Sequence, residues 1–216
     1  MIYLDSAATT FQKPLSVSYA MQRAMRTMSS PGRGGYAAAR AAEETAFRCR
    51  SLAAELFGVP SPEQVVFTSN ATHALNIAIR SLVPEGGRVA VSGYEHNAVT
   101  RPLHALGAEV IVAAAPLFSP QETVEAFERA LAHEPDAVIC THVSNVFGFV
   151  LPIEEIAALC RAEGVPLIVD ASQSAGILPF ELDTLGAAFI AMPGHKGLYG
   201  PQGTGLLLCA HDAAPL

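Results

Sequence analysis

A single lysine in a stretch of glycines and prolines carries the strongest chemical signal in the sequence. Lys196 lies within the segment 192–205, which contains five glycines besides two prolines and follows the apolar run 187–191. Glycine lets the backbone approach a ligand closely, and proline stiffens a loop. An amine held just past a buried strand suits a nucleophile that condenses with a carbonyl group. The alternative is a flexible surface loop that carries a lysine. The spacing fits neither the G-x-x-x-x-G-K-[ST] nor the G-x-G-x-x-G phosphate-binding pattern.

Four further polar clusters follow apolar runs in the same way. They occupy residues 68–72, 94–97, 142–145 and 170–173. In open sheets of parallel strands, ligands bind beyond the carboxyl ends of the strands. We therefore expect these clusters and the Lys196 loop to converge on one edge of a sheet.

Two of the clusters suit charged groups of a ligand. Asp170 ends an apolar run and should be buried, so its carboxylate needs a cation or hydrogen-bond donors. A protonated ring nitrogen would serve, and a helix cap is the alternative. Residues 68–72 precede a predicted helix whose unpaired first-turn N–H groups suit a phosphate. The alternative is an ordinary N-cap formed by Ser69 or Asn70.

The remaining candidates suit a planar ring. His96 has the chemistry to stack on a ring or move protons, although a loop histidine is often merely solvated. Gln173 offers a donor to a ring oxygen, and Asn145 offers one to a ring hydroxyl or to a substrate carboxylate, with a turn residue as the alternative for Asn145. His195 would contact phosphate or hold the lysine loop. Together with Lys196 these residues supply the parts needed to bind pyridoxal 5'-phosphate.

The pattern of the whole chain predicts an α/β fold. Short apolar runs at 64–68, 88–92, 109–113, 137–141, 166–170, 187–191 and 205–209 alternate with helical segments. Continuous apolar strands separated by helices indicate a three-layer, mostly parallel sheet covered on both faces. We assign residues 1–35 to an N-terminal segment and residues 36–216 to the cofactor-binding large domain.

Composition narrows the possible partners and location. The 216-residue chain has a net charge of −7, and 15% of its residues are charged without a long basic run. This argues against nucleic acid or an anionic membrane surface as a partner. No signal peptide or membrane-length apolar stretch is visible. The four cysteines form no C-x-x-C pair, so neither a metal site nor a disulfide framework is expected, and the cytoplasm is the predicted location.

These motifs, in this order, resemble the class V aminotransferase family of fold-type I pyridoxal-phosphate enzymes, within it the cysteine desulfurase and selenocysteine lyase branch. The resembling segments are 3–10, 67–72, 95–97, 141–146, 169–173 and 194–201. The resemblance implies roles for eight residues. Lys196 would form the Schiff base, Asp170 would pair with the pyridine nitrogen, and His96 would stack on the ring. The ring oxygen would face Gln173 and Asn145, and the phosphate would be held by Ala71, Thr72 and His195.

The resemblance also implies an activity and partners. It indicates removal of sulfur from L-cysteine, or of selenium from selenocysteine, by a protein that is a homodimer when complete and passes sulfur to an acceptor protein. Transamination or β-elimination is the alternative reaction. Pro193 departs from the pattern, because many desulfurases carry there a serine that helps to bind phosphate.

Length is the larger departure from the family. Members have a C-terminal small domain that carries the catalytic cysteine and the arginine for the substrate carboxylate. None of Cys49, Cys140, Cys160 and Cys209 corresponds to that cysteine. We therefore expect the large domain of a truncated protein, and a catalytically incompetent fragment is the third possibility.

Overall fold

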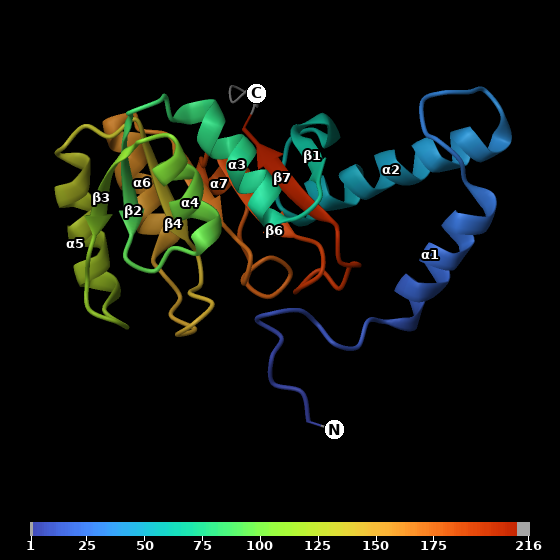
Figure 1. Cartoon of the computed structure of the whole chain (residues 1–216), viewed down its shortest axis with the longest axis horizontal. Coiled ribbons are helices and arrows are strands. Elements are labelled where there is room, and N and C mark those ends of the chain that lie inside the picture. The colour runs from blue at the N-terminus through green and yellow to red at the C-terminus, as the bar shows by residue number, and fades with distance from the viewer. Residues whose placement is uncertain (1, 211–216) are drawn as a thin grey trace.

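The computed structural model describes residues 2–210, and within them seven strands form one sheet (Figure 1). The strand order across the sheet is β1-β7-β6-β5-β4-β2-β3. The strands are β1 (Val65–Thr68), β2 (Arg88–Ser92), β3 (Glu109–Ala113), β4 (Ala137–Thr141), β5 (Leu167–Asp170), β6 (Phe189–Pro193) and β7 (Gly205–Cys209).

The sheet is mostly parallel, as the sequence pattern predicts. Strands β3, β2, β4, β5 and β6 pair in parallel with one another, whereas β7 runs antiparallel to both β6 and β1. A parallel crossover needs a dozen or more residues and usually a helix. Only the lysine loop joins β6 to β7, so the chain turns back on itself there.

Helices cover both faces of this sheet. In the part of the chain that the structure describes, the helices are α1 (Leu15–Thr27), α2 (Ala37–Leu56), α3 (Ala71–Leu82), α4 (Asn97–Ala105), α5 (Pro120–Leu131), α6 (Ile153–Glu163) and the short α7 (Leu182–Leu185), with a 3-10 turn η1 (Pro62–Gln64) before β1. One apolar core lies between the sheet and the end of α2, α5, α6 and α7, and the other lies under α3 and α4. Within β4, Val138 and Cys140 belong to the first core, and Ala137 and Ile139 to the second. This alternation is the period of two that places successive side chains on opposite faces.

Helix α3 shows how the sequence positions the site. Its buried side chains are Ala71, Ala74, Leu75, Ala78 and Ile79. This spacing makes one apolar stripe, which packs on the sheet and contacts β6 and β7. The N-terminus of α3 is thereby held next to the loop that joins those two strands.

The N-terminal part of the chain packs differently. Helix α1 has no buried residue, and it lies away from the sheet with the first part of α2 (Figure 1). The segment before α1 returns to the body beneath the carboxyl edge of the sheet (Figure 1).

All seven predicted strands are present, and the predicted runs 64–68 and 166–170 begin one residue before β1 and β5, whereas two differences are larger. The strand predicted at 187–191 is β6, which begins and ends two residues later, and α7 was not predicted. Gly186 takes a left-handed φ of 63° at the end of α7, so the apolar residues 187–188 still belong to the connection. The predicted domain range 36–216 includes residues 211–216, which lie outside the described residues. No helix among the described residues is long and apolar enough to span a membrane.

Candidate active site

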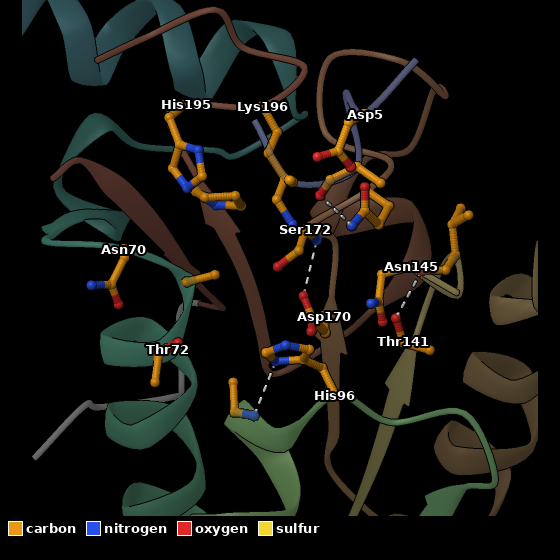
Figure 2. Close-up of a pocket in the computed structure, with 17 residues that line it drawn as sticks. Asp5, Asn70, Thr72, His96, Thr141, Asn145, Asp170, Ser172, His195 and Lys196 are labelled. Carbon is orange, nitrogen blue, oxygen red and sulfur yellow. Dashed lines mark hydrogen bonds between the residues drawn. The ribbon is translucent and has the colours of Figure 1, made fainter. Parts of the chain in front are cut away.

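The predicted site residues meet in one pocket of about 410 Å³ at the carboxyl edge of the sheet (Figure 2). All eight line it: Ala71, Thr72, His96, Asn145, Asp170, Gln173, His195 and Lys196. They come from five different connections, as expected where parallel strands end together.

Lys196 follows β6 and is partly buried, and its side chain points into the pocket (Figure 2). Desolvation lowers the pKa of its amine, and the Asp170 carboxylate opposes this shift. A lowered pKa increases the unprotonated fraction, which is the nucleophile. Gly197 is required beside it, because a Cβ there would collide with the backbone oxygen of Ala175.

Asp170 ends β5 and is 3% exposed, in agreement with the expectation of a buried carboxylate. Its Oδ1 accepts a hydrogen bond of 2.9 Å from the backbone N–H of Ser172. One bond leaves most of the acceptor capacity of the carboxylate available. Asp170 can therefore receive a further donor from the pocket side.

The N-terminus of α3 forms another wall. Asn70 is the N-cap, and its side chain accepts a 2.8 Å bond from the N–H of His73. The N-cap interpretation is thus confirmed for Asn70. The N–H groups of Ala71 and Thr72 bond to no other residue in the described range 2–210, so they can still receive an anion. Gly205 of β7 lets this turn pack closely, since a Cβ there would lie 2.8 Å from the carbonyl carbon of Asn70.

His96 caps α4 with its ring. Its Nδ1 accepts a 3.1 Å hydrogen bond from the N–H of Ala98, and the imidazole lies at the pocket (Figure 2). An accepting Nδ1 carries no proton, so Nε2 holds the proton of the neutral ring. The capping bond therefore fixes both the ring orientation and the tautomer.

Of the two predicted amide donors, one is already engaged. Gln173 Nε2 donates to the backbone oxygen of Ala7 at 3.0 Å, which ties the residue to the N-terminal segment. Asn145 is exposed and lies to the right of Asp170 in Figure 2. Asn145 is thus the freer of the two to contact a ligand.

His195 precedes the lysine and is part-buried. Its Nδ1 lies 3.1 Å from Thr9 Oγ1. Burial lowers its pKa, and the neighbouring cations Lys196 and Lys13 lower it further, against the opposing effect of a backbone hydrogen bond. The ring is therefore mainly neutral at physiological pH.

The pocket also contains residues to which the sequence analysis gave no role in binding a ligand. They are Asp5, Ala7 and Ala8 of the N-terminal segment, Ala98, Thr141, Val143, Ser172 and the capping Asn70. The resemblance named segment 3–10 without giving it a role, and its small residues have no periodicity that would place it. Pro193, noted as a departure, also lines the pocket.

The carboxyl group of Glu95 is buried next to the pocket. Glu95 Oε1 accepts bonds from the Thr141 N–H, at 2.8 Å, and from the Ser92 hydroxyl. Its Oε2 is buried without a hydrogen-bond partner among the described residues. Burial raises the pKa of this carboxyl to about 8, and the Asp170 carboxylate adds to the shift. Glu95 belongs to the predicted cluster 94–97, but the sequence indicated no role for it.

Comparison with known proteins gives consistent results. The family model for class V aminotransferases matches residues 2–215. Cysteine desulfurase IscS of Serratia proteamaculans is 36% identical over 219 residues, which cover 95% of this chain and 52% of the relative. A probable cysteine desulfurase of Methanothermobacter thermautotrophicus is 34% identical, over 98% of this chain and 53% of that protein.

Solved structures show the same relationship. The apo cysteine desulfurase of Thermococcus onnurineus NA1 superposes with a TM-score of 0.90 at 28% identity, covering 98% of this chain and 54% of that one. SspA in complex with cysteine gives a TM-score of 0.83 at 27% identity, over 96% of this chain and 60% of SspA. The chain thus spans about half the length of the curated relatives it matches. The resemblance inferred from the motifs is confirmed: the chain belongs to the class V aminotransferase family.

Proposed function

We propose that this chain is the cofactor-binding part of a pyridoxal-phosphate-dependent cysteine desulfurase. The observation that carries the proposal is the pocket itself. It brings the part-buried amine of Lys196 and the buried carboxylate of Asp170 together with the N-terminus of α3.

The donors and acceptors of the pocket fit this cofactor. Lys196 offers an amine of lowered pKa for an aldehyde, and Asp170 offers an acceptor for a protonated ring nitrogen. The Ala71 and Thr72 amides at the positive end of α3 suit a phosphate. His96 supplies a flat ring whose Nδ1 is fixed by capping. Pro193 offers no hydroxyl, so the grip on the phosphate falls to the α3 amides and to His195.

Each side chain would then have a separate task. When bound, pyridoxal phosphate supplies an electron sink for negative charge that develops on the substrate Cα. Lys196 Nζ would take the proton from that Cα, which its lowered pKa favours near neutral pH. Asp170 would hold a proton on the ring nitrogen, and Asn145 would orient the substrate. His96 Nε2 would move the proton that accompanies departure of sulfur.

The relatives favour cysteine as the substrate. The curated relatives cited above are named cysteine desulfurase or probable cysteine desulfurase, and the structure of SspA contains cysteine. We therefore place desulfuration before transamination or β-elimination. A homodimer and an acceptor protein for the sulfur complete the proposal for the whole protein.

A labelling experiment tests the cofactor assignment directly. The chain has two lysines, Lys13 and Lys196. Incubation with pyridoxal phosphate, borohydride reduction and peptide mapping should place the cofactor on the Lys196 peptide. The variant Lys13→Arg should be labelled equally, and Lys196→Arg should not be labelled. Label on Lys13 alone, or no uptake by a well-folded chain, would refute the assignment.

A separate assay tests the reaction. The complete protein should release sulfide from L-cysteine in the presence of a thiol reductant, and Lys196→Arg should abolish this release. Pyruvate or keto-acid formation without sulfur transfer would instead support elimination or transamination. A cofactor-loaded complete protein that gives none of these products would refute the enzymatic proposal.

A further inference from the structure

The two lysines of the chain lie at opposite ends of the sequence but meet in the structure. Lys13 Nζ donates a 2.8 Å hydrogen bond to the backbone oxygen of His195, the residue before Lys196. It also donates to the hydroxyl of Thr10. No acidic side chain in the described range 2–210 forms an ion pair with Lys13. Its ammonium group is therefore committed to the backbone of the lysine loop.

The His195 carbonyl oxygen collects an unusual number of donors from this segment. Besides Lys13, it accepts from the Thr10 N–H at 3.2 Å, the Thr10 hydroxyl at 3.0 Å and the Thr9 hydroxyl at 3.1 Å. A carbonyl oxygen has two lone pairs, so the four donors share it. The charged donor is the strongest of them, because charge-assisted hydrogen bonds are about twice as strong as neutral ones.

The same segment closes one side of the pocket. Asp5, Ala7 and Ala8 line the pocket, and Gln173 holds the Ala7 oxygen at 3.0 Å. Figure 2 shows Asp5 among the side chains that line the pocket together with Lys196. The ends of the segment are thus fixed at two separate loops of the active site.

Little else holds this segment to the body. Helix α1, which follows it, has no buried residue. The segment is partly organised from within, since the Tyr3 hydroxyl donates to the Thr9 oxygen at 2.8 Å. Its attachment to the lysine loop therefore depends on the donors that meet at His195.

We propose that residues 5–13 form a strap that positions Lys196, and that Lys13 is the positioning residue that anchors it. A bond to the His195 oxygen fixes the plane of the peptide that joins His195 to Lys196. That plane sets the direction in which the Lys196 side chain leaves the backbone. The role rests on the proposed function of Lys196, but the attachment of the strap can be measured without cofactor.

The test compares the reactivity of the Lys196 amine in full-length chains free of cofactor. Each variant is acetylated with limiting acetic anhydride, and the extent at Lys196 is read by peptide mass spectrometry. In Lys13→Met, where Lys196 is the sole lysine, we expect acetylation roughly three- to tenfold faster, the scale of one charged hydrogen bond at a part-exposed site. Lys13→Arg keeps a charged donor and should restore the rate to within about twofold.

Two controls separate positioning from general loosening. Arg23→Met also removes one positive charge, from exposed α1, and should leave the Lys196 rate unchanged. Thr10→Val removes a neutral hydroxyl donor and should raise the rate of Lys196 acetylation less than Lys13→Met does. This variant still tests the strap if Lys13→Met folds poorly. Urea midpoints of all variants are measured alongside.

The outcomes distinguish this inference from the proposed function. An unchanged Lys196 rate in folded Lys13→Met, or an equal rise in Arg23→Met, would overturn the strap. Failure of the protein to take up pyridoxal phosphate would refute the proposed function but leave a Lys13-dependent rate of acetylation intact. If cofactor does bind, Lys13→Met should weaken its retention by a similar factor, and unchanged retention would count against the strap.

Discussion

Glu95 provides the sharpest prediction about stability, because its carboxyl is buried beside the active site. Oε1 accepts two hydrogen bonds, so the proton of the neutral acid belongs on Oε2, which is buried without a described partner. Burial raises its pKa from 4.5 to about 8, with Asp170 contributing. The folded chain therefore holds this proton at pH values where the unfolded chain has lost it.

The size of the effect follows from that difference. A shift of one pKa unit corresponds to about 1.36 kcal/mol. The stabilisation is fully present below pH 4.5 and is lost as the pH rises from 4.5 through 8, because over this range the unfolded state ionises while the folded state keeps its proton. The loss reaches about 3 kcal/mol at pH 7 and approaches 5 kcal/mol above pH 9.

The substitution Glu95→Gln removes this penalty without removing the hydrogen bonds. The amide oxygen can accept from Thr141 and Ser92, and the amide stays neutral at every pH. The variant should match the parent near pH 4.5 and exceed it by about 3 kcal/mol at pH 7, with the gap widening to pH 9.

Urea unfolding followed by circular dichroism from pH 4.5 to 9 measures the gap. Taking the difference between the two chains cancels all other titrating groups. Glu109→Gln is the matched control, because Glu109 is exposed and pairs with Arg88 on the surface; its effect should stay within about 1 kcal/mol. A Glu95→Gln chain less stable than its parent at pH 8, or a gap independent of pH, would refute a neutral Glu95.

Three further predictions follow from the structure. Asp170→Asn should leave Lys196 able to take up cofactor but lower turnover of the complete protein by roughly 10²–10³, and unchanged spectra and turnover would remove Asp170 from the site. Burial lowers the pKa of His142 from 6.5 to about 4, so the free energy of unfolding should fall by about 3 kcal/mol as the pH falls from 6.5 to 4. In urea titrations, His142→Phe should abolish that part of the acid sensitivity, and an unaltered dependence of stability on pH would contradict the prediction. Gly197→Ala should cost about 1–3 kcal/mol in urea unfolding, because its Cβ would meet the Ala175 oxygen, whereas Gly93→Ala, with open space around it, should cost less.

The sequence predicted the fold and the pocket well where local pattern determines position. Asp170 and Lys196 each follow a continuous apolar run, and such a run becomes a strand buried on both faces. Parallel strands end at one edge, so the side chains after them meet without any further information. The same reasoning brought His96, Asn145 and the start of α3 to the pocket.

Local pattern failed where the position of a segment is set by distant partners. The antiparallel direction of β7 follows from the short lysine loop, which leaves no room for a crossover helix. The buried state of Glu95 depends on the Thr141 backbone, 46 residues away. In both cases the decisive partner is far along the chain, and no periodicity records it.

The N-terminal strap is the clearest case of a segment whose position depends on distant partners. It also shows that the site includes more than the lysine loop and the other strand ends. Thr9, Thr10 and Lys13 contact His195 across more than 180 residues of sequence. Gly197 lets the backbone after Lys196 pack closely against Ala175, and the bonds to the His195 oxygen hold the peptide plane before Lys196. The strap supplies that partner through polar bonds, so removing the Lys13 ammonium group should loosen the segment while the Thr9, Thr10 and Gln173 bonds remain.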